Sequence, residues 1–353
     1  MKKLLYCSYS CIPSNTANSV AVMKQCAALD KKCDLRIILT KPYGNVKDYA
    51  QVYNVQNLKM IRLPKFMLKV KEYPMILFVL IYVFLFRPDC IYSRDLLIND
   101  ALSFWGIPSI YEMHQLEQEN LIFNRYYQKV LNRVLKRRTQ VKIVCISEEL
   151  KKQCIKRGVP KECMTVLHSG VDLSNNRSTA REFSDNPLIM YTGSLQPGKG
   201  IEIILEMAEK SPDLKYVIVG GSKEYTYEIP NVKVIPWVNH SEVPKYLMQA
   251  DILLLPVTNQ RYQFFSPLKM FEYLAAEKII IASDTESVSE ILEPGYNALL
   301  AKSGDADSFL ACVRKVCEDK ELQKTIRDNT LRTAQKYTWD IRAERIIKLF
   351  DQY

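Results

Sequence analysis

The segment PLIMYTGSLQPGKGIEIILEMAEK (187–210) decides the fold, because a short apolar run, a glycine-rich turn and an apolar-periodic stretch follow one another in it. The run has the length of a buried strand, and the apolar spacing after Gly200 is that of a helix. Such a turn presents backbone N–H groups and the positive end of the helix dipole to an anion, and Lys199 adds a full charge. The segment therefore favours a diphosphate site. A plain turn with a solvated lysine stays open, since neither GxGxxG nor GxxxxGK[ST] is matched.

Apolar runs of strand length recur along the whole chain. They lie at 4–9, 34–40, 59–64, 89–94, 108–113, 142–147 and 164–170, and then at 187–194, 215–221, 232–238, 251–257 and 278–284. Short apolar strands separated by crossover-length segments predict parallel sheets covered on both faces.

The chain is too long for one hydrophobic core, because 353 residues exceed what a single core usually supports. The polar stretch SNNRSTAREFSDNP (174–187) has the composition of a linker. We therefore predict two doubly wound, Rossmann-like α/β domains, residues 1–178 and 187–337. The last segment, 338–353, has apolar residues at helical spacing and predicts an amphipathic helix.

The composition is that of a folded cytoplasmic protein. Hydrophobic residues make up 48% of the chain and charged residues 25%, which argues against disorder. The ten cysteines are scattered without a CxxC pair, so we expect reduced thiols. The apolar stretch of MKKLLYCSYSCIPSN is short and interrupted, which indicates a first strand rather than an export signal. With three histidines and no HExxH motif, we expect no metal site.

A second motif, SPLKMFEYLAAE (266–277), is typical of a loop that enters a helix, with Ser266 as N-cap and Pro267 as the first helical residue. Glu272 then has mostly apolar or small helical neighbours. Its carboxylate lies either at a surface edge or against a ligand. An isolated buried carboxylate is costly, whereas one that accepts two ribose hydroxyl hydrogen bonds is satisfied.

Three segments of the second half together resemble the donor domain of the family 4 glycosyltransferases, the retaining GT-B class. They are YTGSLQPGKGIE (191–202), SPLKMFEYLAAEKIIIASD (266–284) and SEILEPGYNALLAKSGDADSF (289–309). The first half is similar to the same family through PSNTANSVAVMKQCAAL (13–29), IYSRD (91–95), IYEMHQLE (110–117), CISEELKKQC (145–154) and HSGVD (168–172). The resemblance covers essentially the whole chain in order. It implies two Rossmann-like domains facing a cleft, with the helix 338–353 packed back on the first domain.

The resemblance also implies roles for individual residues of the second domain. Lys199 would contact the donor diphosphate, and Glu272 would be the second glutamate of the E-x7-E signature and bind the ribose. The phosphate site would be completed by Gly193, Ser194, Gly200, Ser266, Pro267 and Leu268. Trp237 could lie near the donor base, although a core position is the favoured alternative.

Two positions depart from the family pattern. Ser194 stands where a basic residue often follows the turn glycine, which leaves Lys199 with more of the charge neutralisation. Phe264 stands where the first glutamate of E-x7-E would fall, which weakens the expectation of a sugar-hydroxyl contact there.

On the acceptor side, His114 would match the histidine that orients the reacting sugar or the acceptor. A lone histidine is also often a satisfied structural residue. The same side would include Arg94, in the YSRD turn, and three residues of the loop after the first strand, for which an ordinary turn is the alternative: Ser14, Asn15 and Asn18. The other two histidines, His168 and His240, are interpreted as structural or surface residues.

The implied enzyme is a hexosyltransferase-type glycosyltransferase that takes a sugar from a nucleotide-diphosphate donor, UDP-sugar being favoured and GDP-sugar possible. Transfer would retain configuration, because the leaving diphosphate takes the proton from the acceptor hydroxyl on the same face. The catalytic set would be His114, Lys199 and Glu272. Lys199 and a helix N-terminus would substitute for a metal ion, so we expect no cofactor. An epimerase or an inverting transferase of the same fold is the alternative.

The charge is concentrated in the first half, where residues 1–178 carry 28 Lys and Arg against 14 Asp and Glu. In RYYQKVLNRVLKRRTQVK (125–142), an apolar stripe is expected from Tyr126, Tyr127, Val130, Leu131, Val134 and Leu135. Basic residues lie away from it: Arg125, Lys129, Arg133, Lys136 and Arg137. This pattern suits an anionic membrane surface, and a solvated helix packed on the core is the alternative.

The most apolar stretch, PMILFVLIYVFLF (74–86), is preceded by further basic residues and is too short to span a bilayer, which needs about 20 residues. It is either a buried crossover helix or an interfacial element. These features favour an enzyme at the inner face of the cell membrane that extends a lipid-linked saccharide in cell-surface polysaccharide biosynthesis. Nucleic acid is not an expected partner, because no nucleic-acid-binding motif is found.

Overall fold

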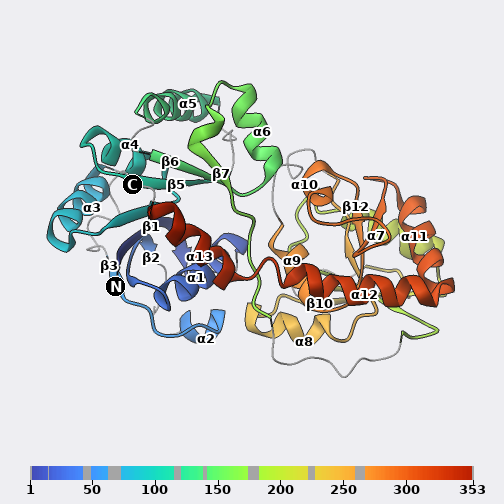
Figure 1. The fold of residues 1–353 in the computed structure, drawn as a ribbon. Coiled ribbons are helices and arrows are strands. Elements are labelled where there is room, and N and C mark those ends of the chain that lie inside the picture. Colours follow the sequence, from blue (N-terminus) through green and yellow to red (C-terminus); the bar gives the residue numbers. More distant parts are fainter. Residues whose placement is uncertain are drawn as a thin grey trace. The chain divides into compact units, whose positions relative to one another are not determined.

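The computed structural model describes residues 2–14, 16–42, 49–62, 73–114, 121–137, 141–173, 183–221, 227–258 and 267–351. The chain divides into two compact units: unit 1 is Met1–Gly170 with Trp339–Tyr353, and unit 2 is Val171–Thr338. The division lies a few residues before the polar segment 174–187, whose residues 174–182 fall outside the described part. Each unit is built from a sheet and the helices packed on it (Figure 1).

Unit 1 contains a seven-stranded parallel sheet with the strand order β3-β2-β1-β4-β5-β6-β7. Its elements are β1 (Lys3–Ile12), α1 (Ala17–Asp30), β2 (Asp34–Pro42), α2 (Tyr49–Tyr53), β3 (Met60–Arg62), α3 (Tyr73–Phe86), β4 (Cys90–Ser93), α4 (Leu96–Phe104), β5 (Ser109–Met113), α5 (Leu121–Lys136), β6 (Val141–Cys145), α6 (Glu148–Lys156), the 3-10 turn η3 (Lys161–Cys163), β7 (Met164–Val166) and α13 (Trp339–Phe350). The strand order reverses direction at β1 and β4, so the carboxyl ends of these two strands form a switch point.

Helix α3 packs on the sheet of unit 1 with one face only. Val79 and Val83 are buried in a cluster with residues of β1, β2, β4 and α4. Four large apolar residues of the same helix are instead 50 to 77% exposed: Leu77, Ile81, Phe84 and Leu85. The segment predicted as either a core helix or an interfacial element thus has a core face and an exposed apolar face.

Helix α5 buries most of the predicted apolar stripe. Tyr127, Val130 and Val134 are buried, and the Tyr127 hydroxyl lies 2.8 Å from the Tyr111 hydroxyl on β5. Tyr126, which the sequence placed in the stripe, is 39% exposed. Consecutive helical residues point about 100° apart, and here Tyr127 faces the core while Tyr126 lies at the edge of the stripe.

The C-terminal helix α13 belongs to unit 1, where it packs against α1. Surface ion pairs join Lys31 to Asp340 (3.2 Å) and Lys32 to Glu344 (2.9 Å). Below them the guanidinium of Arg342 is buried and donates to the carbonyl oxygens of Leu167 (3.2 Å) and His168 (2.8 Å). The helix is therefore fastened to unit 1 through polar contacts as well as through its apolar face.

Unit 2 contains a six-stranded parallel sheet with the strand order β10-β9-β8-β11-β12-β13. Its elements are β8 (Leu188–Thr192), α7 (Ile201–Lys210), β9 (Lys215–Gly221), β10 (Val232–Pro236), the 3-10 turn η4 (His240–Glu242), α8 (Val243–Leu247), β11 (Ile252–Leu255), α9 (Leu268–Ala275), β12 (Ile279–Ser283), α10 (Glu286–Ser289), β13 (Leu299–Ala301), α11 (Ala306–Glu318) and α12 (Lys320–Ala334). The edge strand β13 is not among the strands that the sequence predicts.

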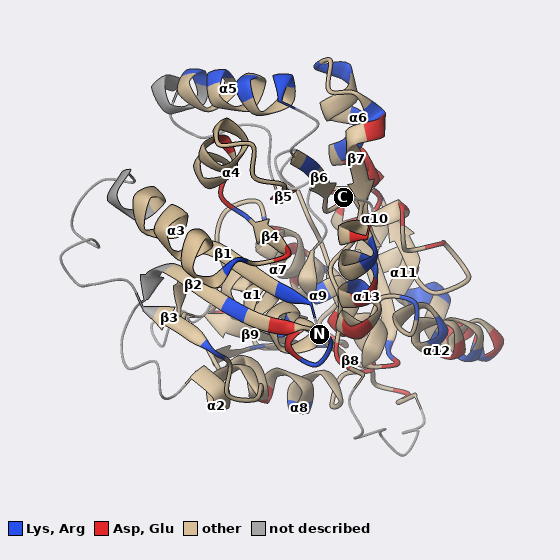
Figure 2. Cartoon of the chain, turned by 60° about the vertical axis from the view of Figure 1, so that its left-hand side comes forward, with Lys and Arg blue, Asp and Glu red and all other residues tan. Residues whose placement is uncertain are grey.

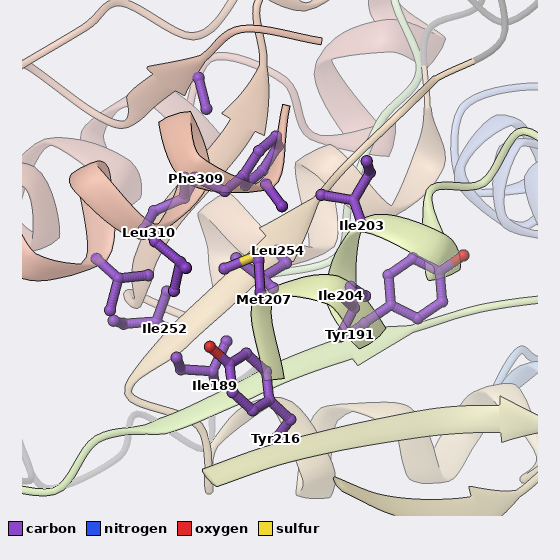
Figure 3. Close-up of a cluster of buried hydrophobic side chains, with 14 of the residues drawn as sticks. Ile189, Tyr191, Ile203, Ile204, Met207, Tyr216, Ile252, Leu254, Phe309 and Leu310 are labelled. Carbon is purple, nitrogen blue, oxygen red and sulfur yellow. The ribbon is translucent and has the colours of Figure 1, made fainter. Parts of the chain in front are cut away.

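The core of unit 2 holds the strand that leads into the glycine-rich turn. Figure 3 shows Ile189 and Tyr191 of β8 with Ile204 and Met207 of α7 among the buried side chains of this cluster. Since both the strand and the following helix are anchored by buried side chains, the turn between them is held at both ends. No helix in the described part of the chain combines the length and apolar character needed to cross a membrane.

Candidate functional site

The turn after β8 contains four of the residues predicted to hold a diphosphate: Gly193, Ser194, Lys199 and Gly200. The N–H of Gly193 donates to the carbonyl oxygen of Val219 on β9 (2.8 Å). Gly200 has a φ of +77°, and a Cβ added there would lie 1.4 Å from the carbonyl oxygen of Pro256, so only glycine fits. Helix α7 begins at the next residue. The strand–turn–helix unit predicted from the sequence is therefore present in unit 2.

Two lysines lie at this turn. Lys199 is part of it and was predicted from the sequence, whereas Lys269 reaches it from α9 and was not. Burial lowers the pKa of Lys199. Lys269, near the start of α9, places its ammonium 3.9 Å from the centroid of the Tyr191 ring. Burial and the nearby charge of Lys199 lower the pKa of Lys269 to about 7, against the opposing effect of Glu272. The helical i, i+3 spacing of Lys269 and Glu272 was the available signal for this second lysine.

Glu272 of α9 is paired with His240, for which the sequence predicts a structural or surface position. Its Oε1 lies 2.6 Å from Nε2 of His240 in η4, and the two side chains are 17% and 24% exposed. Glu272 is thus at a partly exposed edge, which is one of the two predicted positions. The interpretation of His240 as a structural or surface residue missed this contact, because the two residues are 32 positions apart in sequence.

Of the other predicted donor residues, the structure describes Trp237, Pro267 and Leu268. Trp237 follows β10, donates its backbone N–H to the carbonyl oxygen of Gly221 (2.8 Å) and is 42% exposed, so the favoured core position was wrong. Pro267 is the N-cap of α9 and Leu268 is its first residue, so the helix begins one residue later than predicted. Ser266 and Phe264 lie outside the described residues.

In unit 1, the predicted acceptor-side residues His114 and Arg94 are in contact. His114 directly follows β5, and Arg94 follows β4, so both stand at the carboxyl end of the sheet. Nε of Arg94 lies 2.5 Å from Nε2 of His114, and its terminal nitrogen lies 3.0 Å from Nδ1. Burial, and next the charge of Arg94, lower the pKa of His114 to about 3. The imidazole is therefore neutral at neutral pH.

A buried carboxylate, Glu112, lies behind this pair. Its Oε1 is 3.7 Å from Nε of Arg94 and 3.4 Å from Nε2 of His114, and its Oε2 is 3.4 Å from Arg342 of α13. The Tyr92 hydroxyl also donates to it. Burial alone would raise the pKa of Glu112, but the guanidinium groups of Arg342 and Arg94 hold it well below its usual range. The carboxylate is thus ionised and surrounded by donors.

The loop after β1 has well-defined local hydrogen bonds. Asn18 donates its side-chain amide to the Ser10 hydroxyl (2.9 Å), and the Tyr53 hydroxyl lies 2.6 Å from the backbone nitrogen of Ser14. Thr16 caps α1 by accepting from the N–H of Ser19. Asn15 lies outside the described residues. These contacts are those of an ordinary strand-to-helix turn, the alternative that the sequence left open.

Basic residues recur along α5, as Figure 2 shows, and most of them are exposed. Two of them are engaged within unit 1. Arg133 pairs with Asp100 of α4 at 2.6 Å, and Arg137 lies 3.4 Å from the same carboxylate and over the ring of Phe104. Phe104 and its neighbour Trp105 are 68% and 62% exposed. Part of the basic charge that the sequence assigned to a membrane therefore balances Asp100.

Two family models match adjoining parts of the chain. The model described as Glycosyltransferase Family 4 matches residues 19–175, and the model described as Glycosyl transferases group 1 matches residues 174–333. The first covers most of unit 1, and the second contains the turn after β8 together with Lys269 and Glu272.

Curated relatives and solved structures agree with these matches. A putative teichuronic acid biosynthesis glycosyltransferase of Bacillus subtilis, TuaH, is 24% identical over 279 residues, which is 73% of this chain and 67% of that protein. N,N'-diacetylbacillosaminyl-diphospho-undecaprenol alpha-1,3-N-acetylgalactosaminyltransferase of Campylobacter jejuni is 26% identical over 172 residues, 47% of this chain and 45% of that protein. The crystal structure of HepE of Anabaena with UDP and glucose aligns over the whole of both chains with a TM-score of 0.76 at 17% identity.

Proposed function

The chain belongs to glycosyltransferase family 4 and has the two Rossmann-like domains of the GT-B fold, and we propose that it transfers a sugar from a nucleotide-diphosphate donor to an acceptor hydroxyl with retention of configuration. One observation carries the donor part of this proposal. The glycine-rich turn after β8 is approached by Lys199 and Lys269, while Glu272 stands at a partly exposed edge of the same unit. A diphosphate beside two cations and a ribose beside a carboxylate match this distribution of charge.

UDP-sugar is the favoured donor, with GDP-sugar as the second choice. The support is indirect: HepE of Anabaena, which shares the fold, has been crystallised with UDP and with UDP-glucose. Within unit 2, Glu272 accepts a hydrogen bond from His240 when that ring nitrogen is protonated, and a ribose hydroxyl would donate to the same carboxylate.

The chemistry asked of unit 2 is stabilisation of a leaving diphosphate. Negative charge grows on the diphosphate as the glycosidic bond breaks, and cations or backbone N–H groups aimed at it lower the barrier. Lys199 and the N-terminal amides of α7 would supply these interactions, and on this ground we propose that transfer needs no metal ion. The leaving diphosphate would take the proton of the attacking hydroxyl on the same face of the sugar, which gives retention.

In unit 1, His114 would bind a hydroxyl of the reacting sugar or of the acceptor. Its low pKa keeps the ring neutral. The ring nitrogen that carries the single proton could then donate a hydrogen bond to a hydroxyl without introducing a charge. Arg94 fixes the ring plane, and Glu112 fixes Arg94. The group is thus oriented before substrate arrives.

We propose a lipid-linked saccharide as acceptor, in the synthesis of a cell-surface polysaccharide. The names of the Bacillus and Campylobacter relatives, with teichuronic acid and a diphospho-undecaprenol substrate, support this class. An enzyme of this kind works at a membrane surface. The exposed apolar face of α3 and the exposed basic residues of α5 would provide a peripheral contact with anionic lipid.

Product analysis tests the proposed reaction. Purified protein is incubated with UDP-glucose or GDP-mannose and a short-chain polyprenyl diphosphate saccharide, and the products are examined by NMR for linkage and anomeric configuration. A new glycoside with the donor's configuration is the expected result, and Glu272→Ala should abolish it while thermal unfolding stays cooperative. An inverted product, or a changed nucleotide sugar formed without acceptor, would contradict the proposal.

A further inference from the structure

We propose that Lys269 is a second cation of the donor site, which contacts the diphosphate directly and supplies the charge that Ser194 does not. This inference rests on the proposed donor function of unit 2. It concerns a residue that the family resemblance did not single out, and it follows from where the ammonium group lies.

The Lys269 ammonium is fixed directly over the glycine turn. A Cβ added to Gly193 would lie 2.6 Å from its Nζ and 3.3 Å from the Tyr191 hydroxyl, so the ammonium occupies the space beside the Cα of Gly193. The Tyr191 ring beneath it is held by its hydroxyl, which donates to the carbonyl oxygen of Ser194 (2.9 Å). A side chain that emerges from α9 therefore ends at the residues that follow β8.

The positive charge of Lys199 near Lys269 favours the binding of an anion between them. Among the described residues, the titratable groups that act on or face it are Lys199 from the turn before α7, Glu272 from α9 and the Tyr191 ring from β8. Lys199 repels it, and the Glu272 carboxylate is already 2.6 Å from His240. An aromatic face stabilises an ammonium only weakly, and it does not offset a second cation nearby. A diphosphate, with its two or three negative charges, does.

This arrangement makes donor binding depend on pH. The pKa of Lys269 is about 7 without ligand, and an adjacent diphosphate would raise it. A group whose pKa rises on binding contributes its full interaction below the free value and loses it as the pH rises through the bound value. Affinity for a nucleotide sugar should therefore weaken above pH 7, by up to about tenfold per pH unit.

The experiment is isothermal titration calorimetry of the full chain with UDP-glucose, whose esterified diphosphate does not titrate in this range, at pH 6.5, 7.5 and 8.5. UDP, GDP, ADP and dTDP are screened in parallel. The variants are Lys269→Met, which keeps the length of the side chain, and Lys320→Met, which removes an exposed lysine of α12 as the matched control. Thermal unfolding of each variant is recorded first.

We expect Lys269→Met to weaken binding at pH 6.5 by about 10- to 100-fold, as for loss of a charge-assisted contact, and to remove the decline of affinity with pH. Lys320→Met should behave as the parent protein. Should Lys269→Met bind within twofold of the parent with the same pH profile, the inference fails while the donor site stands. Should the parent bind none of the nucleotides, the proposed function itself fails. If Lys269→Met unfolds, Lys269→Arg must retain tight binding with no pH decline, and loss of binding in that folded variant would overturn the inference.

Discussion

The two polar clusters of the molecule differ in how their charges are balanced. In unit 1, Glu112 is buried among Arg342, Arg94 and the Tyr92 hydroxyl, so the carboxylate is compensated within the fold. In unit 2, Lys199 and Lys269 converge on a glycine turn and repel each other. The first arrangement is complete without a ligand and keeps His114 in place. The second places two cations close together, and a bound anion would offset their repulsion, which is what a donor site requires.

The largest effect should follow from breaking the balanced cluster. Arg342→Met leaves Glu112 without one of its two guanidinium partners and frees the carbonyl oxygens of Leu167 and His168. Removal of one partner of a buried ion pair costs about 3–5 kcal/mol. Urea unfolding at pH 7 should show a loss of this size for Arg342→Met and none for the exposed Arg345→Met. Equal stability of both variants would mean that Glu112 does not depend on Arg342.

The opposite result is expected in unit 2. Lys199→Met should leave the free energy of unfolding unchanged within about 0.5 kcal/mol, because in the absence of donor the ammonium has a cationic neighbour. The same change should lower donor affinity by about 10- to 100-fold. Urea unfolding and calorimetry with UDP-glucose measure the two effects. A strongly destabilised variant would show that Lys199 has a structural role instead.

A smaller effect concerns acid stability in unit 1. The pKa of His114 is about 3 in the folded chain, well below its unfolded value, so the unfolded chain binds an extra proton between these values. Stability should therefore fall by about 1–2 kcal/mol as the pH drops from 6.5 to 5. His114→Asn should remove this part of the pH dependence in urea unfolding curves. An unaltered pH profile would show that the pKa of His114 is the same in the folded and unfolded chain.

The smallest effect per residue separates the exposed lysines of α5 from Arg133, which pairs with Asp100. Replacement of Lys129 and Lys136 by Gln should weaken binding to vesicles that contain anionic lipid by about 1 kcal/mol for each residue. The double replacement of Lys320 and Lys324 on α12 serves as control in the same sedimentation assay. Binding that is unchanged in the α5 variant would remove this helix from the proposed membrane contact.

Much of the fold could be predicted from the sequence because most strands lie in short, predominantly apolar runs. The edge strand β13 was not predicted, although β3 and β7, which are also three residues long, were. The glycine turn with Lys199 directly follows such a run, and Glu272 lies in a loop-to-helix motif, so local patterns pointed to these residues as candidates. Lys269 and His240 were not assigned, because each contacts a residue that is distant in sequence. Lys269 lies over the ring of Tyr191, and His240 contacts Glu272.

The same limit explains the errors at the surface. Trp237 was favoured as a core residue on its apolar character, yet it follows an edge strand and is 42% exposed. Tyr126 was counted with a buried stripe that its neighbour Tyr127 occupies. The pairing of Arg133 with Asp100 depends on the packing of α5 against α4, which no local pattern encodes.

The most direct test is the thermal stability of the purified chain with UDP, GDP, ADP, dTDP and CMP, each measured with and without EDTA. We expect at least one nucleoside diphosphate to raise the melting temperature, by the same amount in EDTA, with little effect of CMP, because the two lysines of unit 2 would neutralise a diphosphate unaided. Stabilisation by none of them, or stabilisation that EDTA abolishes, would contradict the assignment of unit 2 as a metal-independent donor site.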